Sequence, residues 1–166
     1  MKQNYSSANT SINSKKLPAV YSKKMVKELH DCYLLDYGCG KYTDHIETWC
    51  KARNIRYLPY DPYNQTEATN KNSIQMAILA KACGNHVVGL CSNVLNVVDS
   101  DDAIQDIINS LAILANVALF TVYEGDKTGI GKATSADSYQ RNEKLKNYLR
   151  FFPSRSVYRQ GCILMF

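Results

Sequence analysis

Two aspartates and two glycines in the first half of the sequence have the types and spacing of a ligand-binding site. Asp36 precedes Gly38 and Gly40 in the stretch LLDYGCGKYTDH, and Asp61 ends the next apolar stretch, in YLPYDPYN. Glycines at such a bend let the chain turn sharply and leave backbone N–H groups accessible to a ligand. A carboxylate at the end of a second strand can accept hydrogen bonds from a ribose diol. These residues therefore predict a pocket for an adenosine-type nucleoside.

The bend differs from a dinucleotide-binding loop in one position. Such loops have a third glycine three residues after the second, where this chain has Thr43. A carboxylate ahead of the first glycine also suits a cationic ligand better than a pyrophosphate. S-adenosylmethionine carries an ammonium and a sulfonium group and no phosphate, so the bend favours it as the cofactor.

The hydrophobic pattern predicts strands alternating with helices. We expect strands at 33–36, 55–61, 86–94 and 117–123, helices at 21–30, from 44, at 72–83, 99–115 and about 136–150, and a closing strand pair at about 156–166. Asp44 is expected to cap its helix, and 62–70 to be a loop. This alternation predicts an α/β fold, with a mostly parallel sheet flanked by helices. Ligands of such sheets bind at the carboxyl ends of the strands, here 36–40, 61, 92–96 and 123–126.

Length and composition predict a single domain over 15–166. The chain has 166 residues, of which 45% are hydrophobic, and residues 1–14 form a polar tail that we expect to be disordered. The sequence has neither an apolar leader nor a membrane-spanning apolar run, so we expect a cytoplasmic protein, in the host cytoplasm if it is viral. Its six cysteines form no C-x-x-C pair, which favours reduced thiols, and its histidines lack metal-ligand spacing, so no metal is expected.

The net charge of +5 is concentrated toward the two ends of the chain, around an acidic centre. These basic regions could form a surface for a polyanion such as nucleic acid, or could simply keep a tail and a helix in solution. GDKTGIGKA, residues 125–133, fails the phosphate-loop pattern and could be either a lid or a plain surface loop. Tyr123 and Tyr139 are candidates for stacking on a flat acceptor.

Several of these segments together resemble a known family. LLDYGCG resembles motif I of the class I, Rossmann-like S-adenosylmethionine-dependent methyltransferases, and YLPYDPYN resembles their acidic second-strand motif. With KKLP, SNVLNVVDSDD and FTVYEGDKTGIGK, they resemble a group of small methyltransferases found in bacteriophages and, in longer relatives, beside DNA phosphorothioation systems. The resemblance covers about 15–150. It implies a Rossmann-like sheet with helices on both faces, an antiparallel C-terminal strand, and methyl transfer by direct displacement.

The resemblance also implies roles for individual residues. Those that would bind the cofactor are Asp36, Gly38 and Gly40 at the methionine part, Asp61 at the ribose, Pro62 and Tyr63 near the adenine, and Asn93 near the transferring methyl group. Asn96 and Glu124 would border the acceptor as the catalytic candidates. Glu124 would orient the acceptor or take its proton. An ion pair of Glu124 with Lys127 or Lys132 is the structural alternative.

The methyl acceptor stays open at this point, between nucleic acid and a small molecule. The chain lacks the N/D-P-P-Y motif of amino-methyltransferases, and no proline precedes any of its cysteines, as cytosine C5 methylation would require. Two other functions remain. One is a protein that binds or degrades S-adenosylmethionine without methyl transfer, and so counteracts host restriction. The other is an interaction protein with a degenerate site.

Overall fold

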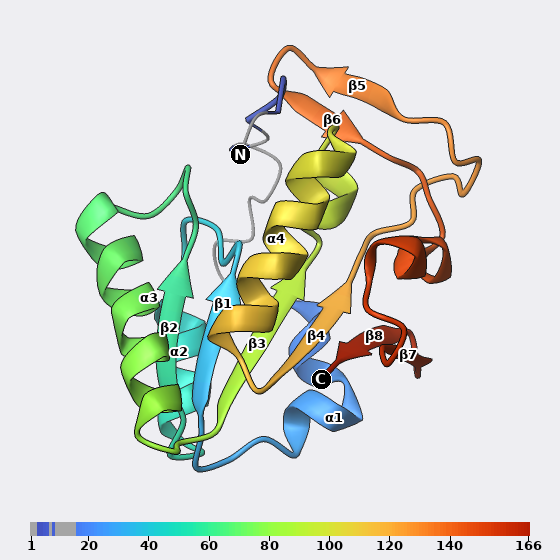
Figure 1. The fold of residues 1–166 in the computed structure, drawn as a ribbon. Helices are drawn as coiled ribbons and strands as arrows, with labels where there is room; N and C mark the ends of the chain where they lie inside the picture. The colour runs from blue at the N-terminus through green and yellow to red at the C-terminus, as the bar shows by residue number, and fades with distance from the viewer. Residues whose placement is uncertain (1–2, 7, 9–15) are drawn as a thin grey trace.

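The structure is a computed structural model that describes residues 3–6, 8 and 16–166. Its centre is a six-stranded sheet in the order β2-β1-β3-β4-β8-β7 (Figure 1). The parallel strands are β1 (Tyr33–Tyr37), β2 (Arg56–Tyr60), β3 (Val87–Ser92) and β4 (Val117–Thr121). Strand β8 (Cys162–Met165) runs antiparallel to β4 and to β7 (Val157–Arg159). The predicted α/β fold and the closing strand pair are thus confirmed.

Helices cover both faces of this sheet because its central strands are apolar on both sides. Leu35 packs in a core with α3 (Glu67–Ala82), α4 (Asp101–Leu114) and the 3-10 helix η3 (Leu145–Phe151). Leu34, on the opposite face, packs in a second core with η1 (Ala19–Ser22), α1 (Lys24–Lys27) and α2 (Asp44–Lys51). Alternate residues of one strand therefore belong to different cores, as strand geometry requires.

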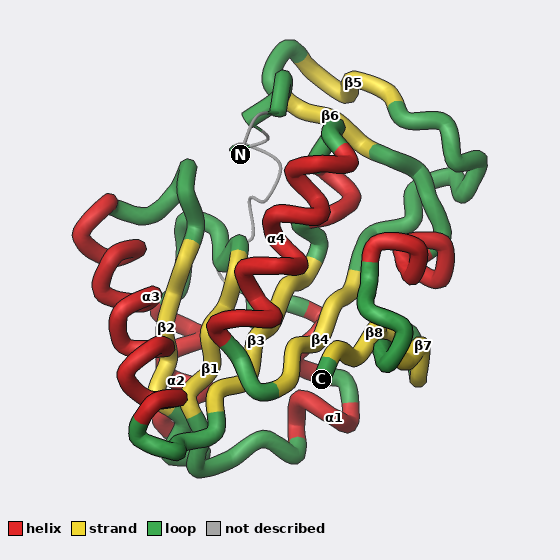
Figure 2. Tube along the Cα trace, viewed as in Figure 1, coloured by secondary structure: helices red, strands yellow, loops and turns green. Residues whose placement is uncertain are grey.

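The helix predicted over 136–150 is wrong. Strand β6 (Ser138–Gln140) forms an antiparallel hairpin with β5 (Lys132–Ser135), and helical structure begins only at Leu145. Gln140 is buried and donates to the backbone oxygen of Tyr123 at 3.0 Å, so long-range contacts override the local helical pattern. The hairpin lies at the same end of the molecule as the carboxyl ends of β1 to β4 (Figure 2).

Three helices also begin or divide differently from the predictions. The expected loop at 62–70 ends early, because the Thr66 hydroxyl accepts from the backbone N–H of Thr69 and caps α3. The expected helix at 21–30 is divided into η1 and α1 by Lys23, whose backbone is extended. Asp44 is the first helical residue of α2 rather than its cap. At this position its carboxylate interacts favourably with the positive end of the helix dipole.

The predicted tail over 1–14 lies largely outside the described residues. Residues 3–6 and 8 are described, and Gln3, Ser6 and Ala8 line a cleft at the carboxyl edge of the sheet. All six cysteines are free thiols, as expected. No described helix combines the length and the apolar composition needed to cross a membrane.

Candidate functional site

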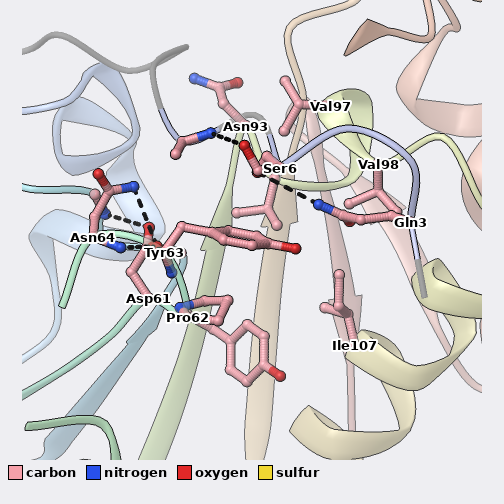
Figure 3. A pocket seen from close by; sticks show the side chains of 15 residues that line it. Gln3, Ser6, Asp61, Pro62, Tyr63, Asn64, Asn93, Val97, Val98 and Ile107 are labelled. Carbon is pink, nitrogen blue, oxygen red and sulfur yellow. Dashed lines mark hydrogen bonds between the residues drawn. The ribbon is translucent and has the colours of Figure 1, made fainter. Parts of the chain in front are cut away.

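The main cleft lies where the strand order reverses. Strand β1 has β2 on one side and β3 on the other, so the loops that leave these strands diverge and open a cleft at their carboxyl ends. Including its open mouth and the solvent space within it, the cleft has about 600 Å³ of space. Six of the predicted cofactor residues line it: Gly38, Gly40, Asp61, Pro62, Tyr63 and Asn93. Figure 3 shows the last four of these.

The backbone conformation of the bend after β1 requires glycine at two positions. Gly38 and Gly40 have φ angles of 88° and 74°, which side chains other than glycine's rarely allow. A Cβ atom on Gly38 would also overlap Cγ2 of Val94, a residue that lines the cleft. The backbone N–H groups of Gly38 and Cys39 donate to the Tyr60 oxygen at 2.7 and 3.2 Å, which ties the bend to the end of β2.

Asp61 links the loop after β1 to the loop after β2 through its hydrogen bonds. Its Oδ1 accepts from the backbone N–H groups of Tyr63 and Asn64, both at 2.9 Å, and from Asn64 Nδ2 at 3.2 Å. Its Oδ2 accepts from the backbone N–H of Gly40 at 3.0 Å. Because a carboxylate oxygen has two acceptor positions, Oδ2 keeps one for a ligand. Asp61 therefore shapes the cleft and also lines it.

Two amide side chains that the sequence analysis missed brace this arrangement. Asn70 accepts from the backbone N–H of Asp61 and donates to its carbonyl oxygen, both at 2.9 Å. Gln65 Nε2 donates to the Gly40 carbonyl oxygen at 2.7 Å. The Asn and Gln residues in the segment 64–70 are the signal for such contacts, but the same composition is typical of a loop.

Asp36 lines a second, smaller cleft that adjoins the main one. It is only 5% exposed, and its Oδ2 accepts from the hydroxyl groups of Tyr21 at 2.9 Å and Tyr57 at 3.0 Å. Burial raises the pKa of Asp36 to about 6, although the two tyrosine hydrogen bonds act in the opposite direction. Sequence reasoning missed both tyrosines, because their contact with Asp36 depends on strand register and on the fold of η1.

The two clefts share Gly38 and Asn93, so they adjoin at these residues. Asp36 and Asp61 are their charged side chains, and among the described residues no lysine, arginine or histidine lines either cleft. Asn93 stands between the two clefts with φ at 58°, and its backbone N–H donates to the Thr121 oxygen at 2.9 Å. Two buried carboxylates without a lining cation favour a cationic ligand and disfavour a phosphate.

The wall opposite Tyr63 is apolar. It comes from the segment after β3 and from α4, and Figure 3 shows Val97, Val98 and Ile107 across the cleft from Tyr63. The segment holding Gln3 and Ser6 also borders the cleft, and Asn4 next to them donates its backbone N–H to the Asp99 carboxylate at 3.1 Å. An aromatic ring facing an aliphatic wall is suited to a flat, uncharged group.

The two predicted catalytic residues do not line these clefts. Asn96 is 2% exposed, and its Nδ2 donates to Gln140 Oε1 at 3.0 Å beneath the hairpin. Glu124 accepts from the backbone N–H of Leu145 at 2.8 Å and forms an ion pair with Lys127 at 3.4 Å. The backbone hydrogen bond chiefly, and Lys127 after it, hold the pKa of Glu124 below its usual value. The structural ion pair is therefore present.

Comparison with known proteins identifies no family. No protein-family model and no curated protein matches this sequence. Within the described part of the chain, no group of three or more His, Cys, Asp or Glu side chains is arranged to hold a metal ion. The function must therefore be argued from the geometry of the cleft.

Proposed function

We propose that the protein binds S-adenosylmethionine across the two adjoining clefts and transfers its methyl group to an acceptor. The observation that carries this proposal is the charge of the site: Asp36 and Asp61 line the clefts, and no described basic side chain accompanies them. Among nucleoside cofactors, one with two cationic groups and no phosphate matches such a site. The cytoplasm, of the host if the protein is viral, is the compartment that goes with this function.

The residues of the site fit this ligand. Asp61 Oδ2 would accept from a ribose hydroxyl, with Pro62 and Tyr63 on one side of the adenine and the aliphatic wall on the other. Asp36, beyond the shared Gly38 and Asn93, would hold the cationic methionine end. The glycine bend lies between the two carboxylates, with Gly38 lining both clefts.

The chemistry requires little beyond correct positioning. The bound sulfonium supplies an electrophilic methyl carbon. As the acceptor's lone pair forms a bond to this carbon, the carbon–sulfur bond breaks and its electrons remain on sulfur as a neutral thioether. If the acceptor is an amine or hydroxyl, its proton then leaves to solvent or to a nearby base. Alignment of the two reactants by the protein can contribute roughly 7–11 kcal/mol to such a step.

Titration calorimetry with S-adenosylmethionine tests the binding step. We predict that Asp61→Ala weakens binding by about 1–3 kcal/mol, because a hydrogen bond to a charged group is lost. Asp126→Ala is the matched control, since this exposed carboxylate pairs with Lys132 and lines neither cleft. Thermal unfolding of both variants checks that they are folded. Equal affinity of the wild type and a folded Asp61→Ala protein would contradict the assigned role.

The position of Asn96 and Glu124 away from the clefts favours one alternative, a protein that binds or degrades the cofactor without methyl transfer. Incubation with methyl-labelled cofactor separates the two functions. Label in an added acceptor supports methyl transfer. Loss of the cofactor without any acceptor supports degradation, and stable binding without either supports sequestration.

A further inference from the structure

A third cleft lies on the same edge of the sheet, beyond β4. Because β8 runs antiparallel to β4, with Phe120 opposite Ile163, the turn between β7 and β8 comes to the carboxyl end of β4. This turn and the segment leaving β4 enclose the cleft, which has about 680 Å³ of space including its open mouth. We call it the tyrosine cleft, and the residues used below are Tyr123, Glu124, Lys127, Tyr158 and Gly161.

Two exposed aromatic rings line this cleft. Tyr123 is 64% exposed and lies two residues after the end of β4, while Tyr158 is 46% exposed and belongs to the edge strand β7. Most large side chains of the protein are buried against the core, but Tyr123 and Tyr158 are not. Exposed tyrosines that border one hollow offer flat surfaces on which nucleobases stack, with little dependence on sequence.

Lysines from both basic ends of the chain meet at this cleft. Lys127 lines it, and Lys23 Nζ donates to the Gln160 oxygen at 3.3 Å, directly beside Gly161. Lys144 is near enough to contribute, after the Leu145 backbone and Lys127, to the lowered pKa of Glu124.

The acids around the tyrosine cleft are already paired. Glu124 pairs with Lys127, Asp126 with Lys132, and Glu143 with Arg150. Lys23 and Lys144 are therefore in excess over the carboxylates at this edge, which suits a polyanion.

The tyrosine cleft is one strand away from the cofactor clefts. The Thr121 hydroxyl donates to the Ser92 hydroxyl at 3.0 Å, and the Thr121 oxygen accepts from the backbone N–H of Asn93. Ser92 and Asn93 line the smaller cofactor cleft, while Val122, next to Thr121, lines the tyrosine cleft. A group held by the tyrosine cleft thus lies beside the end of the cofactor site that would carry the methyl group.

We infer that the tyrosine cleft binds single-stranded nucleic acid, with a base against Tyr123 and Tyr158 and the backbone phosphates near Lys23 and Lys144, the lysines that form no ion pair with a described carboxylate. The inference rests on the proposed function where it names this strand as the methyl acceptor. Duplex nucleic acid does not fit the same description, because its bases are paired and stacked on one another and would have to leave the helix to reach the rings.

Fluorescence anisotropy with a labelled oligothymidine, alone and paired with its complement, tests the inference. The single strand is expected to bind more tightly than the duplex. Tyr123→Ala and Tyr158→Ala are each expected to weaken its binding by roughly 5- to 150-fold, the usual range for loss of one stacking ring. Lys23→Ala is expected to reduce the slope of log affinity against log salt by about 0.7.

Two control variants make the result specific. Tyr158→Phe keeps the ring and is expected to bind as the wild type does. Tyr42→Ala removes a tyrosine of similar exposure, 42%, that lines none of the three clefts, and should also leave binding unchanged. Duplex preference, absence of single-strand binding, or wild-type affinity in folded Tyr123→Ala and Tyr158→Ala proteins would overturn the inference.

Titration of the same preparations with S-adenosylmethionine separates the two proposals. Normal cofactor binding without oligonucleotide binding overturns the tyrosine-cleft inference alone. Oligonucleotide binding that depends on the tyrosines, without any cofactor binding, overturns the proposed function alone and supports the cleft as a nucleic-acid site.

Discussion

Replacement of Asp36 by asparagine should stabilise the folded protein at alkaline pH and weaken cofactor binding. In the folded protein, burial raises the pKa of Asp36 from 3.8 to about 6. Since one pKa unit corresponds to about 1.4 kcal/mol, the ionised carboxylate lowers the free energy of unfolding by up to about 3 kcal/mol above pH 6. Asparagine carries no charge, and its Oδ1 can still accept from Tyr21 and Tyr57.

The stability difference should depend on pH in a defined direction. Because the pKa of Asp36 is higher in the folded than in the unfolded state, folding takes up a proton between about pH 4 and pH 6. The wild type should therefore gain stability as the pH falls through this range, and the advantage of Asp36→Asn, largest at pH 8, should disappear near pH 4. Other titrating groups are common to both proteins and cancel in the difference.

Urea unfolding of both proteins at pH 8, 6 and 4 measures this difference. Asp126→Asn is an informative control, because hydrogen bonds from Thr128 lower the pKa of Asp126, so its contribution is present at pH 8 and is lost as the pH falls. Cofactor affinity of the wild type should also decrease by about tenfold per pH unit below 6, as Asp36 becomes protonated. A difference between wild type and Asp36→Asn that is constant from pH 8 to 4 would refute the reasoning.

Three further substitutions test the frame of the site, each by urea unfolding. Gly38→Ala should cost about 2 kcal/mol or more, because φ is positive and the new Cβ meets Val94, and adding Val94→Ala should recover the steric part. Asn70→Ala should cost about 1–3 kcal/mol and weaken cofactor binding, because the backbone N–H of Asp61 loses its partner. Thr66→Ala should cost about 1 kcal/mol through loss of the α3 cap, with cofactor affinity unchanged.

The parallel sheet could be predicted from the sequence because its strands are continuous apolar segments. Leu34 and Leu35 point to opposite faces and are both fully buried, which leaves a pattern distinct from that of an amphipathic helix. The positions of Asp36 and Asp61 followed from the same pattern, since each stands where an apolar segment ends. The glycine bend between them was therefore placed correctly at the edge of the sheet.

The contacts that complete the site could not be predicted in this way, because they depend on residues far apart in the chain. Tyr21 reaches Asp36 only because η1 folds back over the end of β1. The hairpin at 132–140 was missed because Tyr139 stacks on Tyr5 and Gln140 bonds to Asn96, contacts with no local signature. Polar side chains at these positions satisfy long-range partners, whereas sequence patterns report mainly on neighbours.

The choice of tyrosines as the partners of Asp36 bears on what the site can bind. A buried carboxylate is usually paired with a lysine or arginine, which would cancel its charge and leave the cleft without attraction for a cation. Tyr21 and Tyr57 donate hydrogen bonds but carry no charge, and burial raises the pKa of both hydroxyls further, so they stay neutral. The negative charge of Asp36 therefore remains uncompensated within the protein above pH 6. A bound cation would stabilise the ionised carboxylate. The free energy by which ionised Asp36 destabilises the folded protein would then contribute to binding of the cation.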